Sequence, residues 1–129
     1  MKSWRHNFIG MVCLVLGFMA AWQALPTWAK GSPPPQGKLA ILEFGRGICP
    51  KCKEMEGIIK NLQARYGDRV ELKLLYIDRD EPLFDKYKVM LVPTQVFLDA
   101  GGNEVSRHIG LFPEAELVQK LKELKFIQE

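Results

Sequence analysis

Two cysteines separated by two residues, in the segment CPKC at residues 49–52, are the side chains whose type and spacing suggest chemistry. Such a pair can act as a redox dithiol, as half of a metal site or as a structural disulfide. A tetrahedral zinc site needs four ligands, and beyond the first thirty residues the chain offers only one histidine, His108, and no second pair of cysteines. A structural disulfide across so short a loop would remove little entropy from the unfolded chain. The spacing therefore favours a redox dithiol, with the other two kinds of site as alternatives.

The predicted position of this pair is the junction between a strand and a helix. Cys49 falls at the helix N-terminus, where unpaired backbone N–H groups and the helix dipole stabilise an anion, and the thiolate is the reactive form of cysteine. Cys52 follows one turn later, from where it can attack a mixed disulfide at Cys49 and release the partner. Lys51 adds a cation beside the pair, and Arg46 and Lys53 raise the positive potential further. We predict that Cys49 is the nucleophile and Cys52 the resolving thiol.

The rest of the chain supplies the elements that must hold this junction in place. Hydrophobic periodicity and turn residues predict strands at 39–44, 70–77, 94–98 and 104–109, and helices at about 50–66, 82–88 and 113–126. Pro82 is expected to open the middle helix. Apolar stripes mark the buried faces of the other two helices, with Met55, Ile58, Ile59, Leu62 and Tyr66 on the first and Leu117, Val118, Leu121 and Leu124 on the last.

The order β-α-β-α-β-β-α predicts an α/β fold with a central mixed sheet and helices on both faces. The first strand–helix–strand unit should be parallel, and the last two strands should form an antiparallel hairpin across the turn at 99–103.

The first thirty residues have the order of an export signal. Lys2 and Arg5 precede an apolar run over residues 8–22, and Ala29 offers a small residue for cleavage. The run is shorter than the roughly 20 residues that span a bilayer, so we predict a signal peptide over 1–29, with a retained membrane anchor as the alternative. Residues 30–37, KGSPPPQG, predict an extended proline-rich spacer, and residues 38–129 a single domain.

Composition excludes several classes of protein. In 129 residues, 26% are charged and 47% hydrophobic, as in ordinary globular proteins and unlike disordered, collagenous or polytopic membrane chains. The net charge of +3 gives no reason to expect a nucleic-acid partner. Cys13, the third cysteine, lies within the apolar run and is expected to be a small hydrophobic residue there.

Three stretches, AILEFGRGICPKC, YIDRDEPLFDKYKVMLVPTQVFLDAGGNEV and HIGLFPEAELVQKLKEL, together resemble the thioredoxin superfamily over about residues 38–126. The resemblance implies a minimal thioredoxin-like fold in which Cys49 and Cys52 are catalytic. It also implies that Glu43, six residues before the first cysteine, is a buried acid that exchanges a proton with Cys52. The alternative is a strand glutamate with its carboxylate in solvent.

The resemblance further implies that Pro93 is a cis-proline facing the dithiol and that the backbone of Val92 binds an extended substrate. The remaining residues that it implies in substrate binding are Thr94, Gly110, Pro50, Lys51 and Ile48. The chain also departs from the family pattern. Ile48 stands where thioredoxins carry tryptophan, Leu74 where a lysine usually accompanies the buried acid, and KGSPPPQ replaces their first strand and helix.

These features together predict an exported, monomeric thiol–disulfide oxidoreductase in a periplasm or at the outer face of the cytoplasmic membrane. It would exchange disulfides with protein substrates and with a membrane-embedded or soluble thiol protein as electron donor or acceptor. It would need no cofactor beyond its own redox-active disulfide, and we favour reduction over oxidation of substrates. The alternatives are a binding or chaperone module without turnover and a CxxC carrier of copper or zinc.

Overall fold

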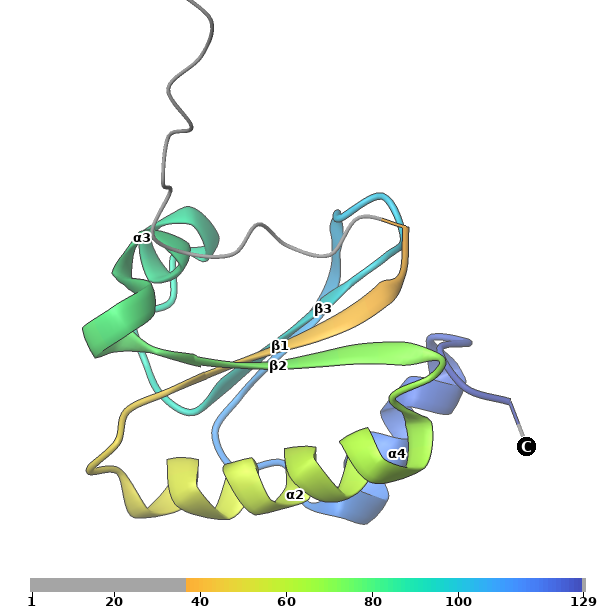
Figure 1. Cartoon of the computed structure of the whole chain (residues 1–129), viewed down its shortest axis with the longest axis horizontal. Helices are drawn as coiled ribbons and strands as arrows, with labels where there is room; N and C mark the ends of the chain where they lie inside the picture. The colour runs from red at the N-terminus through yellow and green to blue at the C-terminus, as the bar shows by residue number, and fades with distance from the viewer. Residues whose placement is uncertain (1–36, 129) are drawn as a thin grey trace, which may run out of the picture.

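A computed structural model describes residues 37–128 (Figure 1). The predicted export segment and the spacer as far as residue 36 lie outside this range. The elements follow the predicted order: β1 Leu39–Gly45, α2 Pro50–Tyr66, β2 Val70–Tyr76, α3 Ile77–Tyr87, β3 Thr94–Leu98, β4 Glu104–Ile109 and α4 Glu114–Glu123. No helix between residues 37 and 128 is long and apolar enough to cross a bilayer.

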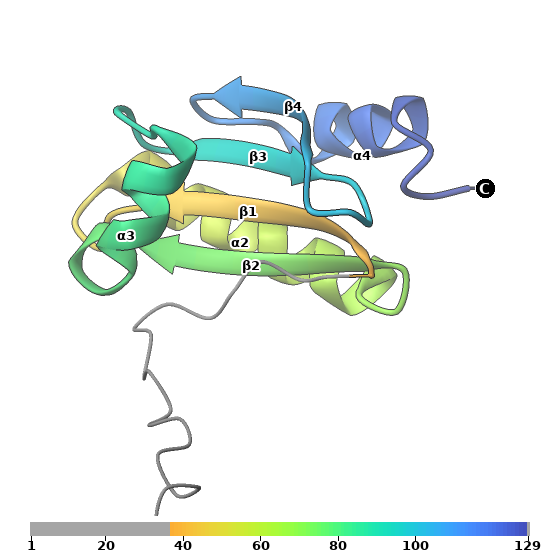
Figure 2. The same ribbon diagram turned by 90° about the horizontal axis from the view of Figure 1, so that it is seen from above.

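The four strands form one mixed sheet in the order β2-β1-β3-β4. β1 is parallel to β2 and antiparallel to β3, and β3 is antiparallel to β4, as the sequence predicts. Because β1 and β3 run in opposite directions, the end of β1 lies beside the start of β3, and the end of β4 lies there too (Figure 2). The functional residues predicted from sequence therefore gather at one end of the sheet.

Helices cover both faces of the sheet, α2 and α4 on one side and α3 on the other (Figure 1). Alternate residues of the central strand β1 point to the two sides, so Ile41 enters the core under α2 and α4 while Ala40 and Leu42 enter the core under α3. A strand buried on both faces needs a nearly continuous apolar sequence, which explains the composition of residues 39–44. Glu43 interrupts that sequence.

The helix predicted to begin at Pro82 begins five residues earlier. α3 starts at Ile77 and consists of two helical segments that meet at Asp80, whose φ of −117° and ψ of 22° are not helical. The carboxylate of Asp80 accepts a hydrogen bond from the backbone N–H of Tyr76 at 2.9 Å. Pro82 follows Asp80 closely and so lies in the first turn of the second segment, where proline is tolerated. The sequence identified that segment and missed the first one.

The last helix is shorter than predicted, because it ends at Glu123 in a left-handed cap. Lys125 has a φ of 59°, and two backbone bonds close the cap, from Phe126 N–H to Leu121 carbonyl (2.8 Å) and from Lys125 N–H to Lys122 carbonyl (2.9 Å). These are the bonds of a Schellman motif. Of the predicted apolar stripe, Leu117 and Leu121 are fully buried, and Val118 and Leu124 are half-buried at its margins.

Candidate active site

Cys49 caps the N-terminus of α2. Its backbone is extended (φ −88°, ψ 117°), and its sulfur accepts a hydrogen bond from the backbone N–H of Cys52 at 3.3 Å. Pro50 occupies the first helical turn, where its missing N–H leaves no bond unmade. The sequence-based placement of this sulfur at a helix N-terminus is confirmed.

This position lowers the pKa of the Cys49 thiol below its ordinary value. The largest cause is the hydrogen bond with the Cys52 side chain, and the backbone N–H groups of Cys52 and Lys51 and the charge of Lys51 add to it. All of these groups favour the thiolate over the thiol. Lys53, predicted to add to the positive potential, pairs instead with Glu56 at 3.2 Å, so part of its charge is compensated.

Cys52 lies one turn behind Cys49 and is only 5% exposed. The end of β1 packs closely on Cys52. A Cβ atom added at Gly45 would lie 3.4 Å from the Cβ of Cys52 and 3.8 Å from its sulfur, which is van der Waals contact. Burial, followed by the hydrogen bond to Cys49, raises the pKa of Cys52 to about 11. The two thiols, both free in the structure, therefore differ sharply in reactivity.

We expect iodoacetamide to alkylate Cys49 rapidly at about pH 7 and to leave Cys52 unmodified in the folded chain. With a pKa of about 11, only on the order of 10⁻⁴ of Cys52 is thiolate at that pH. Mass spectrometry of the digested protein measures the two modifications separately, and unfolding in urea before alkylation should equalise them. Equal rates in the folded protein would contradict the assignment of Cys49 as the reactive thiol.

Glu43 projects from β1 into the core under α2 and is 2% exposed. Burial raises its pKa to about 8; neighbouring Gln95 lowers the pKa somewhat, and the charge of Cys49 raises it. The alternative of a carboxylate in solvent is therefore wrong. In the parallel register Glu43 stands opposite Leu74, so the neighbouring position on β2 carries no charge, as the sequence predicted.

The peptide bond between Val92 and Pro93 is cis. Two hydrogen bonds hold the surrounding loop, from Thr94 Oγ1 to the Leu91 carbonyl at 2.7 Å and from the Gly110 N–H to the Pro93 carbonyl at 2.8 Å. Gly110 has a φ of 105°, which disfavours a side chain there. The structure thus brings Pro93, Thr94 and Gly110 together where β3 starts and β4 ends (Figure 2).

Several large apolar side chains at this end of the sheet are exposed to solvent. Ile48 is 87% exposed, Met90 89%, Leu91 63% and Ile109 55%. Ile48 adjoins Cys49, and the other three flank the loop of Pro93. A hollow of about 360 Å³ beside Ile48 is bounded also by Arg46, Gly47, Ile77 and Asp78. Adjacent exposed apolar residues are typical of interaction sites.

Sequence reasoning missed Met90 and Leu91 in this apolar group. The signal was two large apolar residues directly before the Val92-Pro93 pair, in a segment with no helical or strand periodicity. It also missed Gln95, a fully buried amide on β3 directly opposite Glu43. The signal for Gln95 was an isolated polar residue in a strand that is otherwise apolar from Val96 onward.

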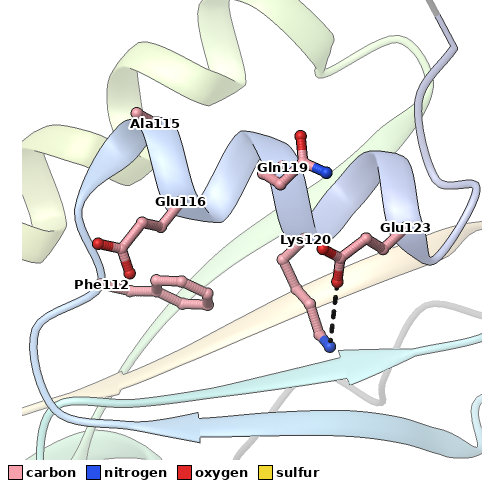
Figure 3. Close-up of a pocket in the computed structure, with 6 residues that line it drawn as sticks. All are labelled: Phe112, Ala115, Glu116, Gln119, Lys120 and Glu123. Carbon is pink, nitrogen blue, oxygen red and sulfur yellow. Dashed lines mark ion pairs between the residues drawn. The ribbon is translucent and has the colours of Figure 1, made fainter.

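A second hollow, of about 430 Å³, lies along α4 (Figure 3). It is lined by Phe112, Ala115, Glu116, Gln119, Lys120 and Glu123, and the last two form an ion pair at 3.6 Å. All of these residues except Phe112 lie on α4, and none is a cysteine or belongs to the loop of Pro93. We therefore assign the active site to the dithiol end and not to this hollow.

Within residues 37–128, no group of three or more histidine, cysteine or acidic side chains is arranged to hold a metal ion. The one histidine in that range, His108, stacks on Phe112 with ring centroids 4.0 Å apart. The end of the sheet that carries the cysteine pair also carries a buried carboxyl, a cis-proline loop and exposed apolar side chains.

A helix-capping cysteine of lowered pKa, a buried partner thiol and a neighbouring buried acid, on this fold, define a protein disulfide oxidoreductase. The family model described as Thioredoxin matches residues 35–123, and the chain belongs to the thioredoxin family.

Relatives and solved structures agree with this assignment. The chain is 34% identical to Thioredoxin-1 of Drosophila melanogaster over 80 residues, 62% of this chain and 75% of that protein. It is 34% identical to the thiol:disulfide interchange protein TxlA of Synechococcus elongatus over 122 residues, 88% of this chain and 64% of that protein. The crystal structure of the Drosophila melanogaster thioredoxin Deadhead superposes with a TM-score of 0.62 at 32% identity, covering 68% of this chain and 82% of the other. The predicted thioredoxin-like fold is therefore confirmed.

Proposed function

We propose that this thioredoxin-family oxidoreductase reduces disulfides of exported proteins through Cys49 and Cys52. The thiolate of Cys49 attacks one sulfur of a substrate disulfide, that bond breaks, and one substrate thiolate leaves. Cys52 then loses its proton, its thiolate attacks the sulfur of Cys49, and the second substrate thiolate leaves. The substrate gains two electrons, and Cys49 and Cys52 become a disulfide. The observation that carries this proposal is the contrast between Cys49, a half-buried thiol of lowered pKa, and Cys52, a buried thiol of raised pKa.

The buried carboxyl of Glu43 is the proposed acceptor of the proton that Cys52 must lose. A pKa of about 8 leaves roughly a tenth of Glu43 ionised at pH 7, and a group that titrates near the working pH is well suited to give and take a proton. The resulting neutral acid returns the proton when the pair is reduced again.

The proposed substrate groove lies between the cysteine pair and the loop of Pro93. Pro93 shapes the groove, and the backbone of Val92 binds the extended substrate. Its walls are proposed to be Thr94, Gly110, Pro50, Lys51 and Ile48. The exposed apolar side chains at this end support the proposal, because an unfolded or extended substrate segment presents apolar residues that these can cover.

The site of action is proposed to be a periplasm or the outer face of the cytoplasmic membrane. The support is the order of residues 1–29, with Lys2 and Arg5 before an apolar run and Ala29 at its end. A soluble or membrane-embedded thiol protein on that side would return the electrons. A fusion of residues 1–37 to alkaline phosphatase, which is active only after export, tests the location. An inactive fusion would contradict it.

The direction of the reaction is tested by the reduction potential of the Cys49–Cys52 pair, measured by equilibration with glutathione. A reductase should have a potential of about −270 mV, the value of thioredoxin, while a strong oxidant should lie near −120 mV. We expect a value closer to the first. A value near the second would overturn the proposed direction and leave the dithiol chemistry standing.

A further inference from the structure

Gln95 is a buried amide that the proposed chemistry does not use. It is fully buried on β3 and stands directly opposite Glu43 of β1 in the antiparallel register. Side chains of directly opposed residues lie on the same face of a sheet, about 5 Å apart at their Cβ atoms. Gln95 and Glu43 therefore share the core under α2 with Cys52.

Three oxygens in this pair have no hydrogen-bond partner among the described residues: both carboxyl oxygens of Glu43 and Oε1 of Gln95. The Nε2 of Gln95 donates to the carbonyl of Gly110 at 3.3 Å. A buried polar atom without a partner destabilises the folded state, because it has lost its hydrogen bonds to water. A protonated Glu43 carries a hydrogen that it can donate to the unpartnered Oε1 of Gln95, which would satisfy both atoms.

The ionised acid needs the opposite arrangement. A carboxylate only accepts hydrogen bonds, so it requires the N–H of the amide and not its oxygen. A primary amide carries a donor and an acceptor on the same carbon, and rotation of that group exchanges them. The Gln95 side chain already acts on Glu43 in this sense, because its hydrogen bond lowers the pKa of the carboxyl. A stronger bond from Nε2 to the carboxylate competes with the bond from the same nitrogen to the carbonyl of Gly110, which is long at 3.3 Å.

Gly110 belongs to the loop that the proposed substrate groove uses. Its N–H donates to the carbonyl of Pro93 at 2.8 Å while its own carbonyl accepts from Gln95. We propose that Gln95 is a positioning residue that satisfies Glu43 in both protonation states and transmits that state to Gly110 and Pro93. The effect on turnover rests on the proposed function, whereas the hydrogen-bond exchange does not.

Other titratable groups face the same space and must be separated from Glu43. Cys49 and Cys52 lie toward it from α2, and Tyr76 lies toward it from β2. His108 of β4 stands opposite Gln95 in the register, on the far side from Glu43. A titration seen at Gln95 therefore has to be assigned by removing Glu43 itself.

The test is a titration of the full, reduced chain by nuclear magnetic resonance. We expect the carboxyl carbon of Glu43, the side-chain amide of Gln95 and the carbonyl carbon of Gly110 to shift with one common midpoint near pH 8. In Glu43→Gln the last two signals should lose that midpoint. The proposal is overturned if they stay constant while Glu43 titrates, or if their midpoint survives in Glu43→Gln and so belongs to His108 or a cysteine.

A variant adds a second measurement. Gln95→Met keeps a similar side-chain length. It removes both the bond that Gln95 can accept from the neutral acid of Glu43 and the bond that it can donate to the carboxylate. The bond to the carboxylate is the stronger of the two because it is charge-assisted. The pKa of Glu43 should therefore rise by about one unit, a roughly tenfold change in proton affinity. Gln119→Met, at an exposed position on α4, is the matched control and should leave the pKa unchanged. An unchanged pKa in Gln95→Met would overturn the proposal.

The experiments can show separately whether the proposed role of Gln95 fails and whether the proposed dithiol mechanism fails. If Cys49→Ser retained disulfide reduction, the dithiol mechanism would fail while the common midpoint of Glu43, Gln95 and Gly110 could still be observed. If the dithiol mechanism held and no common midpoint appeared, only the role of Gln95 would be lost. Under the full proposal, Gln95→Met moves the pH profile of turnover to higher pH in step with the pKa of Glu43.

Discussion

Replacing Cys49 by serine should abolish disulfide reduction, with turnover falling by about a thousandfold or more, as for loss of a catalytic nucleophile. A serine hydroxyl remains protonated at neutral pH even at a helix N-terminus, whereas the same site lowers the pKa of the Cys49 thiol. Reduction of insulin by the chain, with dithiothreitol as electron donor, measures the loss. Gln119→Met, at an exposed position on α4 away from the dithiol, is the control and should retain full activity.

Cys52→Ser separates the two thiols of the pair. Cys49 should still attack the substrate, but nothing would then displace it, so a mixed disulfide between Cys49 and the substrate should accumulate. Mass spectrometry without reductant detects it as an adduct at Cys49 that reductant removes. A binding module without turnover would instead keep its function in Cys49→Ser and form no adduct in Cys52→Ser. That result would overturn the oxidoreductase mechanism.

The parts of the fold that were predictable are those in which local sequence and tertiary environment agree. The bounds of β3 and β4 follow from Thr94, the turn at 99–103 and Ile109, and the structure reproduces them. The first segment of α3 was missed because a bond between Tyr76 N–H and the Asp80 carboxylate stabilises its start, and no apolar periodicity reports such a bond. The end of α4 was missed because Lys125 adopts a left-handed conformation where glycine is the usual signal.

The active site shows the same division. The sequence predicted the spacing of Cys49 and Cys52 and their position at the start of a helix, because a helix N-terminus is a local feature. The burial of Glu43 depends on tertiary structure, because one polar residue in an apolar strand can face either the core or solvent. Only the resemblance to the thioredoxin superfamily favoured the core. Gln95 was missed because its importance depends on the register between β1 and β3, which places it opposite Glu43.

Glu43→Gln is expected to stabilise the reduced protein at alkaline pH. The pKa of Glu43 is raised from its ordinary value of 4.5 to about 8 in the folded state, so the folded chain retains a proton that the unfolded chain releases. Stability changes with pH in proportion to the protons bound by the unfolded state minus those bound by the folded state. That difference is negative between pH 4.5 and 8, so the wild-type protein loses stability as the pH rises through this window.

The expected size of this loss is large for a single residue. Each unit of pKa difference corresponds to about 1.4 kcal/mol, so a shift from 4.5 to about 8 amounts to on the order of 4 kcal/mol at pH 8 and nothing below about pH 4. Glutamine cannot ionise, and its amide N–H can donate to Gln95 Oε1 as the neutral acid would. The free energy of unfolding of Glu43→Gln should therefore exceed that of the wild type by several kcal/mol at pH 8 and converge with it near pH 4.

Urea unfolding of the reduced chain at intervals between pH 4 and 9 measures both curves. Glu54→Gln makes the same chemical change at an exposed position on α2 and is the matched control. Its free energy of unfolding should follow that of the wild type at every pH. Parallel curves for the wild type and Glu43→Gln would show that Glu43 ionises as readily in the folded chain as in the unfolded one. The same variant should reduce insulin more slowly, because Cys52 would have lost the proton acceptor that we propose for it. Higher stability together with lower activity is thus the combined result expected of a buried acid retained for proton transfer.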